Sequence, residues 1–267
     1  METLRPGNFA YGLVVSLGAY FVKKIGALSR LTDGEIWNVR SSVRVATRAF
    51  RMYNLMTIDM SEPPLIICFG DSLTAGYQSP SPVNPAGRAT PYGHMLEKLI
   101  GPRARVAISG TCGELTGEMV MRFRSDVLRQ RPRYVVILGG SNDLGYEASP
   151  QEIMRNLLKM YETARADGII PIPVTVPSIR VPDADNADAV SWLRHHIAGR
   201  QVLNELILEY ARLKQLRSLN LFDATADPQS LQLAARYSND GLHLTTEGYQ
   251  LCATLLYEHI FRTALDH

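Results

Sequence analysis

The stretch Leu65-Ile66-Ile67-Cys68-Phe69-Gly70-Asp71-Ser72, residues 65–72, is an apolar run that ends in a glycine turn. Its apolar residues follow one another without a period of two, which is typical of a strand buried on both faces of a parallel sheet. The chain contains further runs of this kind, and together with 65–69 they predict five strands. The other runs are RVAIS (105–109), YVVIL (134–138), GIIPIPVTV (168–176) and SLNLF (218–222).

Segments with helical spacing of apolar residues lie between or after these runs, and they predict an α/β sandwich with right-handed crossovers. In the fourth run, Pro171 and Pro173 lack the N–H that a sheet ladder needs. Because residues two apart face the same flank of a strand, the loss falls on one flank, and we expect the strand proper to begin near Ile172. The predicted helices cover residues 91–100, 150–166, 200–216 and 245–263.

Two long segments, residues 77–93 and 178–196, are predicted to be loops. Long irregular segments inside a compact domain are often functional, so we expect both to form walls of a substrate cleft. Tolerated insertions are the alternative.

Ser72 follows a glycine turn at the predicted carboxyl end of the first strand, where open α/β sheets place their ligands. The tripeptide by itself also fits an ordinary N-cap serine. Near the other end of the chain, Asp240 precedes His243 by three residues, just ahead of the last predicted helix. At that spacing a carboxylate can hold Nδ1–H of the imidazole and leave Nε2 free to take a proton from a serine.

Donors for a developing oxyanion are predicted at two further strand ends. Asn142 follows the double glycine after the third run, and Gly110 lies just past the second run. A side-chain amide, a bare backbone N–H and the N–H of Ser72 are the kind of donor set that acyl transfer through serine requires.

These residues belong to four short blocks, written out at the end of this paragraph. Taken in chain order, the four blocks resemble those of the SGNH hydrolase superfamily, the GDSL-type esterases and lipases. The resemblance covers about residues 63–263; the residue before Gly110 departs from the asparagine often found near it. It implies a flavodoxin-like three-layer α/β/α sandwich with a five-stranded parallel sheet in the order 2-1-3-4-5. It also implies a catalytic triad of Ser72, Asp240 and His243, and an oxyanion hole made by Ser72, Gly110 and Asn142. The blocks read Gly70-Asp71-Ser72, Gly110, Gly140-Ser141-Asn142-Asp143 and Asp240-Gly241-Leu242-His243.

The composition of the 267-residue chain, with 46% hydrophobic and 20% charged residues, excludes a disordered or fibrous protein. No apolar run approaches twenty residues, which excludes a polytopic membrane protein. Cys68, Cys112 and Cys252 are odd in number and widely spaced, so neither a disulfide framework nor a zinc site is expected. The sequence therefore predicts no cofactor and no metal, and it favours a reducing, cytoplasmic compartment.

The net charge of +2 comes from residues 1–60, which hold eight Lys/Arg against four Asp/Glu. The remainder has 20 Lys/Arg and 22 Asp/Glu, so no nucleic-acid partner is expected. We interpret residues 1–60 as a helical N-terminal extension and residues 61–267 as the hydrolase domain.

Within the extension, residues 9–22 are apolar or small but too short for a comfortable membrane span. Residues 36–53 combine an apolar stripe with a basic one, and a basic amphipathic helix can lie on an anionic membrane surface. The alternatives are a helical hairpin packed on the catalytic domain or on another subunit, and a true start at Met56 or Met60. The apolar stripe is Ile36, Val39, Val43, Ala46, Phe50 and Tyr53, and the basic one is Arg40, Arg44, Arg48 and Arg51.

The sequence thus predicts a serine esterase that hydrolyses small-molecule carboxylic esters or thioesters through an acyl-enzyme on Ser72. A carbohydrate O-acetyl esterase and an acyltransferase are alternatives within the same chemistry. A catalytically silent module that binds lipid or protein is the alternative from another class. The partners expected through residues 1–60 are a membrane surface, by peripheral contact, or a second copy of the chain, by self-association.

Overall fold

The computed structural model describes residues 62–181 and 186–266. These residues belong to one compact unit, which extends over Ser61–His267. The expected helical extension, residues 1–60, lies outside the described residues, as do the alternative start sites Met56 and Met60.

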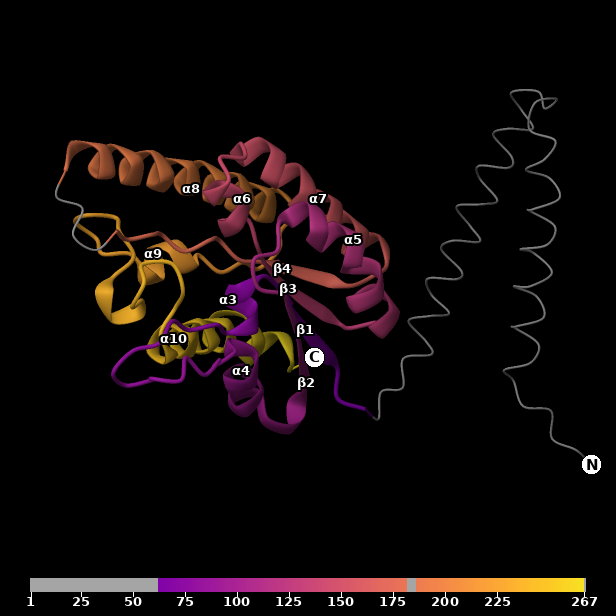
Figure 1. The fold of residues 1–267 in the computed structure, drawn as a ribbon. Coiled ribbons are helices and arrows are strands. Elements are labelled where there is room, and N and C mark those ends of the chain that lie inside the picture. The colour runs from indigo at the N-terminus through magenta and orange to yellow at the C-terminus, as the bar shows by residue number, and fades with distance from the viewer. Residues whose placement is uncertain (1–61, 182–185, 267) are drawn as a thin grey trace, which may run out of the picture. The chain divides into compact units, whose positions relative to one another are not determined.

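A parallel sheet with the strand order β2-β1-β3-β4 forms the centre of the molecule (Figure 1). Its central strands β1 and β3 are buried on both faces, which is why their sequences are apolar without alternation. The predicted α/β class and the order of the first four strands are confirmed. The strands are β1 (Leu65–Gly70), β2 (Arg105–Gly110), β3 (Tyr134–Leu138) and β4 (Ile170–Pro173).

The prediction of a fifth strand at 218–222 is wrong. Only an isolated parallel bridge joins Val174 to Leu219, and the chain enters helix α9 at Leu221. The prolines of β4 explain this difference. Ile170 donates its N–H to Arg133, just before β3, and Val174 donates its N–H to Ile137 within β3. Pro171 and Pro173 therefore face the opposite flank, where a fifth strand would need the N–H groups that prolines lack. The same pairing starts β4 at Ile170, two residues before the predicted start.

Helices cover both faces of the sheet and make the three-layer sandwich (Figure 1). One layer holds α5 (Thr116–Asp126), α7 (Pro150–Ala166) and α8 (Ala187–Leu213). The other holds α4 (Tyr92–Ile100), α10 (Thr246–Leu256) and the π-helical segment η5 (Tyr257–Phe261). The short helices are α3 (Ser72–Ala75), α6 (Ser141–Gly145), α9 (Leu221–Thr225), α11 (Arg262–Ala264), and the 3-10 turns η2 (Gly101–Arg103), η3 (Leu128–Gln130) and η4 (Ala235–Tyr237).

Helix α8 differs from its prediction because it begins at Ala187, within the segment 178–196 that was expected to be a loop. Asn186 caps it by accepting the N–H of Ala189 at 2.8 Å. Helix α5 was not predicted; only Thr116, Met119 and Phe123 of it are buried.

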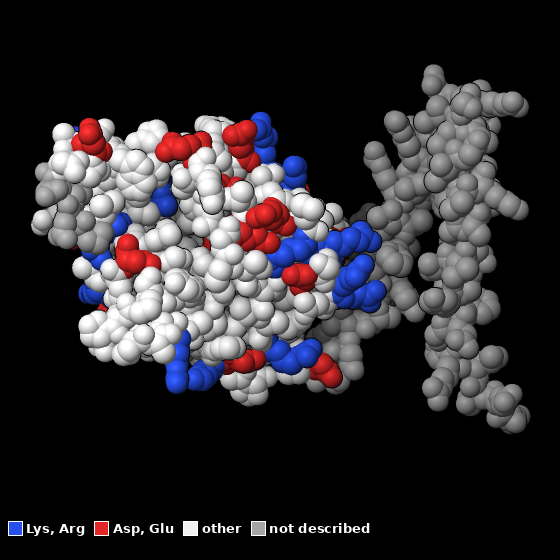
Figure 2. All heavy atoms as spheres, viewed as in Figure 1, with Lys and Arg blue, Asp and Glu red and all other residues white. Residues whose placement is uncertain are grey.

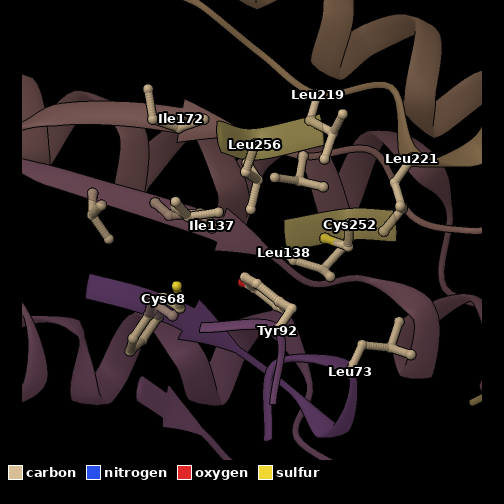
Figure 3. Packing of buried hydrophobic residues seen from close by; sticks show 14 of the residues in the cluster. Cys68, Leu73, Tyr92, Ile137, Leu138, Ile172, Leu219, Leu221, Cys252 and Leu256 are labelled. Carbon is tan, nitrogen blue, oxygen red and sulfur yellow. The ribbon is translucent and has the colours of Figure 1, made fainter. Parts of the chain in front are cut away.

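The core joins both layers to the sheet, and Figure 3 shows the part of it that extends from β1, α4 and α10 past β3 to Ile172, Leu219 and Leu221. Cys68, Tyr92 and Cys252 are all fully or almost fully buried there. Burial raises the pKa of the Cys68 thiol to about 12, although a hydrogen bond with Tyr92 partly offsets it, so this cysteine packs as an uncharged apolar group.

Among residues 62–181 and 186–266, no helix is both long enough and apolar enough to cross a membrane.

Candidate active site

Ser72 is the first residue of α3 and comes directly after the turn that ends β1. Its side chain is buried, with 6% of its surface exposed. Asp71 caps the short helix by accepting the N–H of Leu73 at 2.9 Å. The sharp exit from β1 therefore holds the serine hydroxyl at the carboxyl edge of the sheet, where ligands bind in this class of fold.

His243 reaches Ser72 from the far end of the chain. Its Nε2 lies 3.2 Å from Oγ of Ser72, and its Nδ1 lies 2.7 Å from Oδ2 of Asp240. Asp240 and His243 belong to the turn before α10. In this turn Gly241 has φ +83, and a Cβ added to it would lie 1.8 Å from the carbonyl oxygen of Arg180. The structure thus brings the three predicted residues into one row, here called the Ser–His–Asp row.

Asp240 is held as an anion. Its Oδ1 accepts the N–H groups of Leu242 and His243, each at 2.8 Å, and its Oδ2 accepts a hydrogen bond from Ser79 besides facing His243. Burial raises the pKa of Asp240, but the hydrogen bonds from His243, Ser79 and the backbone outweigh it and hold the pKa well below its ordinary value. A carboxylate that stays ionised fixes the ring so that Nε2 faces the serine.

The two segments expected to be cleft walls both contact this row or its turn where they begin. The ring of Tyr77 packs edge-on against His243, with 4.5 Å between ring centroids. Arg180 donates its backbone N–H to the carbonyl of Gly241 and its side chain to the carbonyl of Ser238. Trp192, by contrast, lies on α8 and stacks on His196 at 3.8 Å.

Gly110 ends β2 beside the helix that carries Ser72. An added Cβ would lie 2.3 Å from the backbone nitrogen of Ala75, so no larger residue fits there. Thr111 donates its N–H to the carbonyl of Gly70 in β1. Since alternate N–H groups of a strand point to opposite flanks, the N–H of Gly110 is directed away from β1 and remains outside the ladder.

Asn142 lies in the first turn of α6, after the turn that ends β3. Its Nδ2 donates to the carbonyl oxygen of Glu114 at 2.9 Å. A side-chain amide has two N–H groups, so one remains for a bound oxygen. The neighbouring Asp143 accepts the backbone N–H and, at 2.6 Å, the hydroxyl of Thr116, and so ties α6 to the start of α5.

Asp71 is the least compensated polar group behind Ser72. It is fully buried, and its Oδ2 has no hydrogen-bond partner among the described residues. Burial raises the pKa of Asp71 to about 7, against the lowering effects of the Leu73 N–H and of His243.

Four contacting residues have no signal in the sequence motifs: Tyr77, Ser79, Glu114 and Arg122. The first two lie in the segment predicted to be a wall, which is the only hint the sequence contains. Glu114 and Arg122 lie in a turn and a helix without any recognisable pattern. In the part of the chain that the structure describes, no three His, Cys, Asp or Glu side chains form a group able to hold a metal ion.

A parallel sheet in this order, with a Ser–His–Asp row at its carboxyl edge, is the arrangement of an ester-bond hydrolase of the SGNH class. The chain belongs to the GDSL-like lipase/acylhydrolase family, whose sequence model matches residues 68–251. A curated relative, the uncharacterized lipoprotein YqeF of Bacillus subtilis, is 30% identical over 116 residues, which are 41% of this chain. The match spans 47% of that relative's length.

Solved structures share the fold at low identity. The lipase/acylhydrolase of Enterococcus faecalis has a TM-score of 0.59 and 23% identity, over 74% of this chain and 95% of that chain. A mutant acetyl-xylooligosaccharide esterase from Geobacillus has a TM-score of 0.60 and 17% identity, over 74% and 94%. A carbohydrate acetylesterase of Sinorhizobium meliloti has a TM-score of 0.56 and 17% identity, over 74% and 99%. The chain is therefore a hydrolase of ester bonds in family and fold.

Proposed function

We propose that the protein is a serine esterase that cleaves carboxylic esters or thioesters through an acyl-enzyme on Ser72. One observation carries the proposal: a single imidazole, that of His243, lies 3.2 Å from Oγ of Ser72 and 2.7 Å from Oδ2 of Asp240. A serine hydroxyl is a weak nucleophile until a base takes its proton, and this geometry supplies the base and the group that orients it.

In the proposed reaction, Nε2 of His243 takes the hydroxyl proton as Oγ of Ser72 bonds to the acyl carbon. The carbonyl oxygen becomes an oxyanion that accepts hydrogen bonds from the N–H groups of Ser72 and Gly110 and from the free N–H of the Asn142 amide. The imidazolium then protonates the leaving alcohol or thiol as the acyl bond breaks. A water molecule, deprotonated by His243, then attacks the acyl carbon, and the acid leaves as Ser72 regains its proton.

The surface around the proposed site suits an uncharged acyl group. In Figure 2 few charged side chains lie over the region that Figure 1 assigns to α3 and the following loop, whereas charges of both signs are interspersed elsewhere on this face. Two of the similar structures are sugar acetylesterases by name, which favours carbohydrate O-acetyl esters as the second candidate substrate.

Replacing Ser72 by alanine tests the nucleophile. We expect the Ser72→Ala variant to lose nearly all turnover of a p-nitrophenyl ester and all labelling by a fluorophosphonate probe, with an unchanged unfolding midpoint. Full esterase activity in that variant would refute the proposal. A wild-type chain that the probe does not label would indicate the catalytically silent binding module instead.

A substrate series then separates the candidates. Hydrolysis rates of p-nitrophenyl esters from acetate to palmitate are measured beside acetylated xylose and glucose. A rate that falls steeply beyond acetate, with turnover of the sugars, favours the O-acetyl esterase. Product acylated on an added alcohol, in excess over free acid, favours the acyltransferase.

For residues 1–60 we propose peripheral contact with anionic membranes, on the basis of the sequence pattern alone. Co-sedimentation with phosphatidylserine vesicles tests this, using the full chain and a chain that begins at residue 61. Equal binding of the two chains would contradict it, and a full chain that forms oligomers without vesicles would favour self-association.

A further inference from the structure

Arg122 of α5 lies behind the proposed oxyanion hole and contacts the ends of β1 and β2, two of the three strand ends that lead into it. Its Nη2 donates to the carbonyl oxygen of Gly70 at 2.9 Å and approaches that of Ser109 at 3.3 Å. Its Nη1 donates to Oγ of Ser109 at 2.5 Å. The guanidinium also lies over the ring of Phe69, 4.2 Å from the centroid, so its plane is held in place.

The contact between Arg122 and Ser109 acts on the N–H of Gly110, the first oxyanion donor, through a single peptide group. The carbonyl of Ser109 and the N–H of Gly110 belong to the same planar trans peptide and point in opposite directions. A guanidinium that holds this carbonyl on the β1 side therefore fixes the direction in which the N–H of Gly110 points.

Arg122 acts on the Asn142 amide, the second oxyanion donor, through Glu114. Arg122 forms a two-pronged ion pair with this residue, with Nε 2.6 Å from Oε1 and Nη2 2.5 Å from Oε2. The carboxylate is buried with 7% exposure, and the backbone carbonyl of the same residue accepts the Asn142 amide at 2.9 Å. That carbonyl decides which way the amide is turned, and with it the direction of the remaining N–H.

We propose that Arg122 is a positioning residue that sets both the Gly110 N–H and the Asn142 amide for the oxyanion. The inference rests on the proposed function of Ser72. It assigns to one side chain the alignment of two donors that come from different strand ends. Hydrogen-bond donors stabilise a developing charge most when they are already aimed at it, so a small turn of either donor reduces the rate. Lysine cannot replace the fork, because an ammonium group cannot hold the carboxylate and two carbonyls in one plane.

The test compares Arg122→Lys with Arg124→Lys, a change at an exposed arginine of the same helix. For hydrolysis of p-nitrophenyl acetate by the full chain, we expect Arg122→Lys to lower kcat on the order of tenfold to a hundredfold with KM nearly unchanged. Arg124→Lys should leave both constants unchanged. A trifluoromethyl ketone, which forms a tetrahedral adduct, should bind Arg122→Lys more weakly by about the same factor.

Two further variants distinguish positioning from a general effect on folding. Glu114→Gln keeps the backbone carbonyl but weakens the ion pair, so its loss of kcat should be smaller than that of Arg122→Lys. In an Asn142→Ala background, Arg122→Lys should cost less than it does alone, because one of the two donors that it aligns is already absent.

Unchanged kcat in Arg122→Lys would overturn the inference, as would a loss that matches a lower folded fraction in thermal unfolding. Losses that multiply fully in the double variant would also overturn it. If Ser72→Ala remains active, the proposed function itself fails. If Ser72→Ala is inactive while Arg122→Lys is fully active, only the role of Arg122 fails.

Discussion

Ser79 donates a hydrogen bond to Oδ2 of Asp240, the same carboxylate oxygen that faces Nδ1 of His243. The serine comes from the loop after α3, and it joins that loop to the turn before α10. This hydrogen bond is one of those that keep the pKa of Asp240 low against the effect of burial.

We expect Ser79→Ala to lower kcat roughly threefold to thirtyfold, since one charge-assisted hydrogen bond to the orienting carboxylate is lost. The remaining hydrogen bonds keep Asp240 ionised near neutral pH, so activity should persist. Steady-state kinetics with a short-chain ester measures the change. Ser81→Ala is the control, because Ser81 accepts the N–H of Asn84 within the same loop and does not touch Asp240. Equal losses in the two variants would point to a general disturbance of the loop.

Asn142→Ala should lower kcat on the order of 10²–10³-fold and leave KM nearly unchanged, because its free N–H is expected to bond the oxyanion and not the ground state. Asn84→Ala serves as the control in an exposed loop. A raised KM with unchanged kcat would mean that the amide binds substrate instead.

The raised pKa of Asp71 leads us to expect that the stability of the protein falls as the pH rises toward neutrality. The pKa of this carboxyl is about 7 in the folded chain and near 3.8 when it is unperturbed, so between these values only the folded state keeps the proton. Raising the pH through this window therefore lowers the free energy of unfolding by up to about 1.4 kcal/mol per pH unit. Asp71→Asn removes the titration, so its stability relative to wild type should rise from pH about 4 to about 7 and then level off.

Urea unfolding at a series of pH values measures this difference. Asp227→Asn is the matched control, because hydrogen bonds from the N–H and hydroxyl of Ser230 hold the pKa of Asp227 below its ordinary value. The contribution of Asp227 to the free energy of unfolding is complete above that ordinary pKa and is lost only toward lower pH. The stability difference between Asp227→Asn and wild type should therefore stay flat over the same window. A flat difference for Asp71→Asn as well would contradict the prediction.

Arg200 is a buried cation with little compensation. Its side chain is 2% exposed, burial lowers its pKa to about 10, and among the described residues it donates only to the carbonyl of His196. Its Nε has no partner there. We expect Arg200→Met to raise the free energy of unfolding by roughly 1–4 kcal/mol, since an apolar side chain of similar length avoids the desolvation of the charge. Arg212→Met, at an exposed ion pair with Glu209, should change it by less than about 0.5 kcal/mol.

Chemical denaturation of both variants measures the two changes. A loss of stability in Arg200→Met would mean that the guanidinium makes interactions that exceed its desolvation cost. A gain in stability together with a loss of esterase activity would mean that Arg200 serves the substrate.

Local patterns in the sequence were sufficient for the central architecture. The apolar runs at 65–69, 105–109 and 134–138 became β1, β2 and β3. The runs of β1 and β3 are apolar throughout because these central strands are buried on both faces, whereas the edge strand β2 is only partly buried and contains Arg105 and Ser109. The predicted fifth strand does not form beyond the single bridge at Leu219, and the reason lies in the pairing of β4, which the sequence does not show. The flank on which Pro171 and Pro173 lose their N–H groups depends on which neighbour β4 adopts, and β4 pairs with β3.

For the site, the sequence by itself determined which residues to consider, since Ser72, Gly110, Asn142, Asp240 and His243 follow strand ends or a turn at recognisable spacings. Only the tertiary structure decided how they are held. Ser79 lies 161 residues from Asp240, and Arg122 lies 52 from Gly70, and these contacts arise because parallel strands bring distant turns to one edge of the sheet. A hydrogen bond depends on distance and direction between atoms, which short motifs do not encode for residues far apart in the chain.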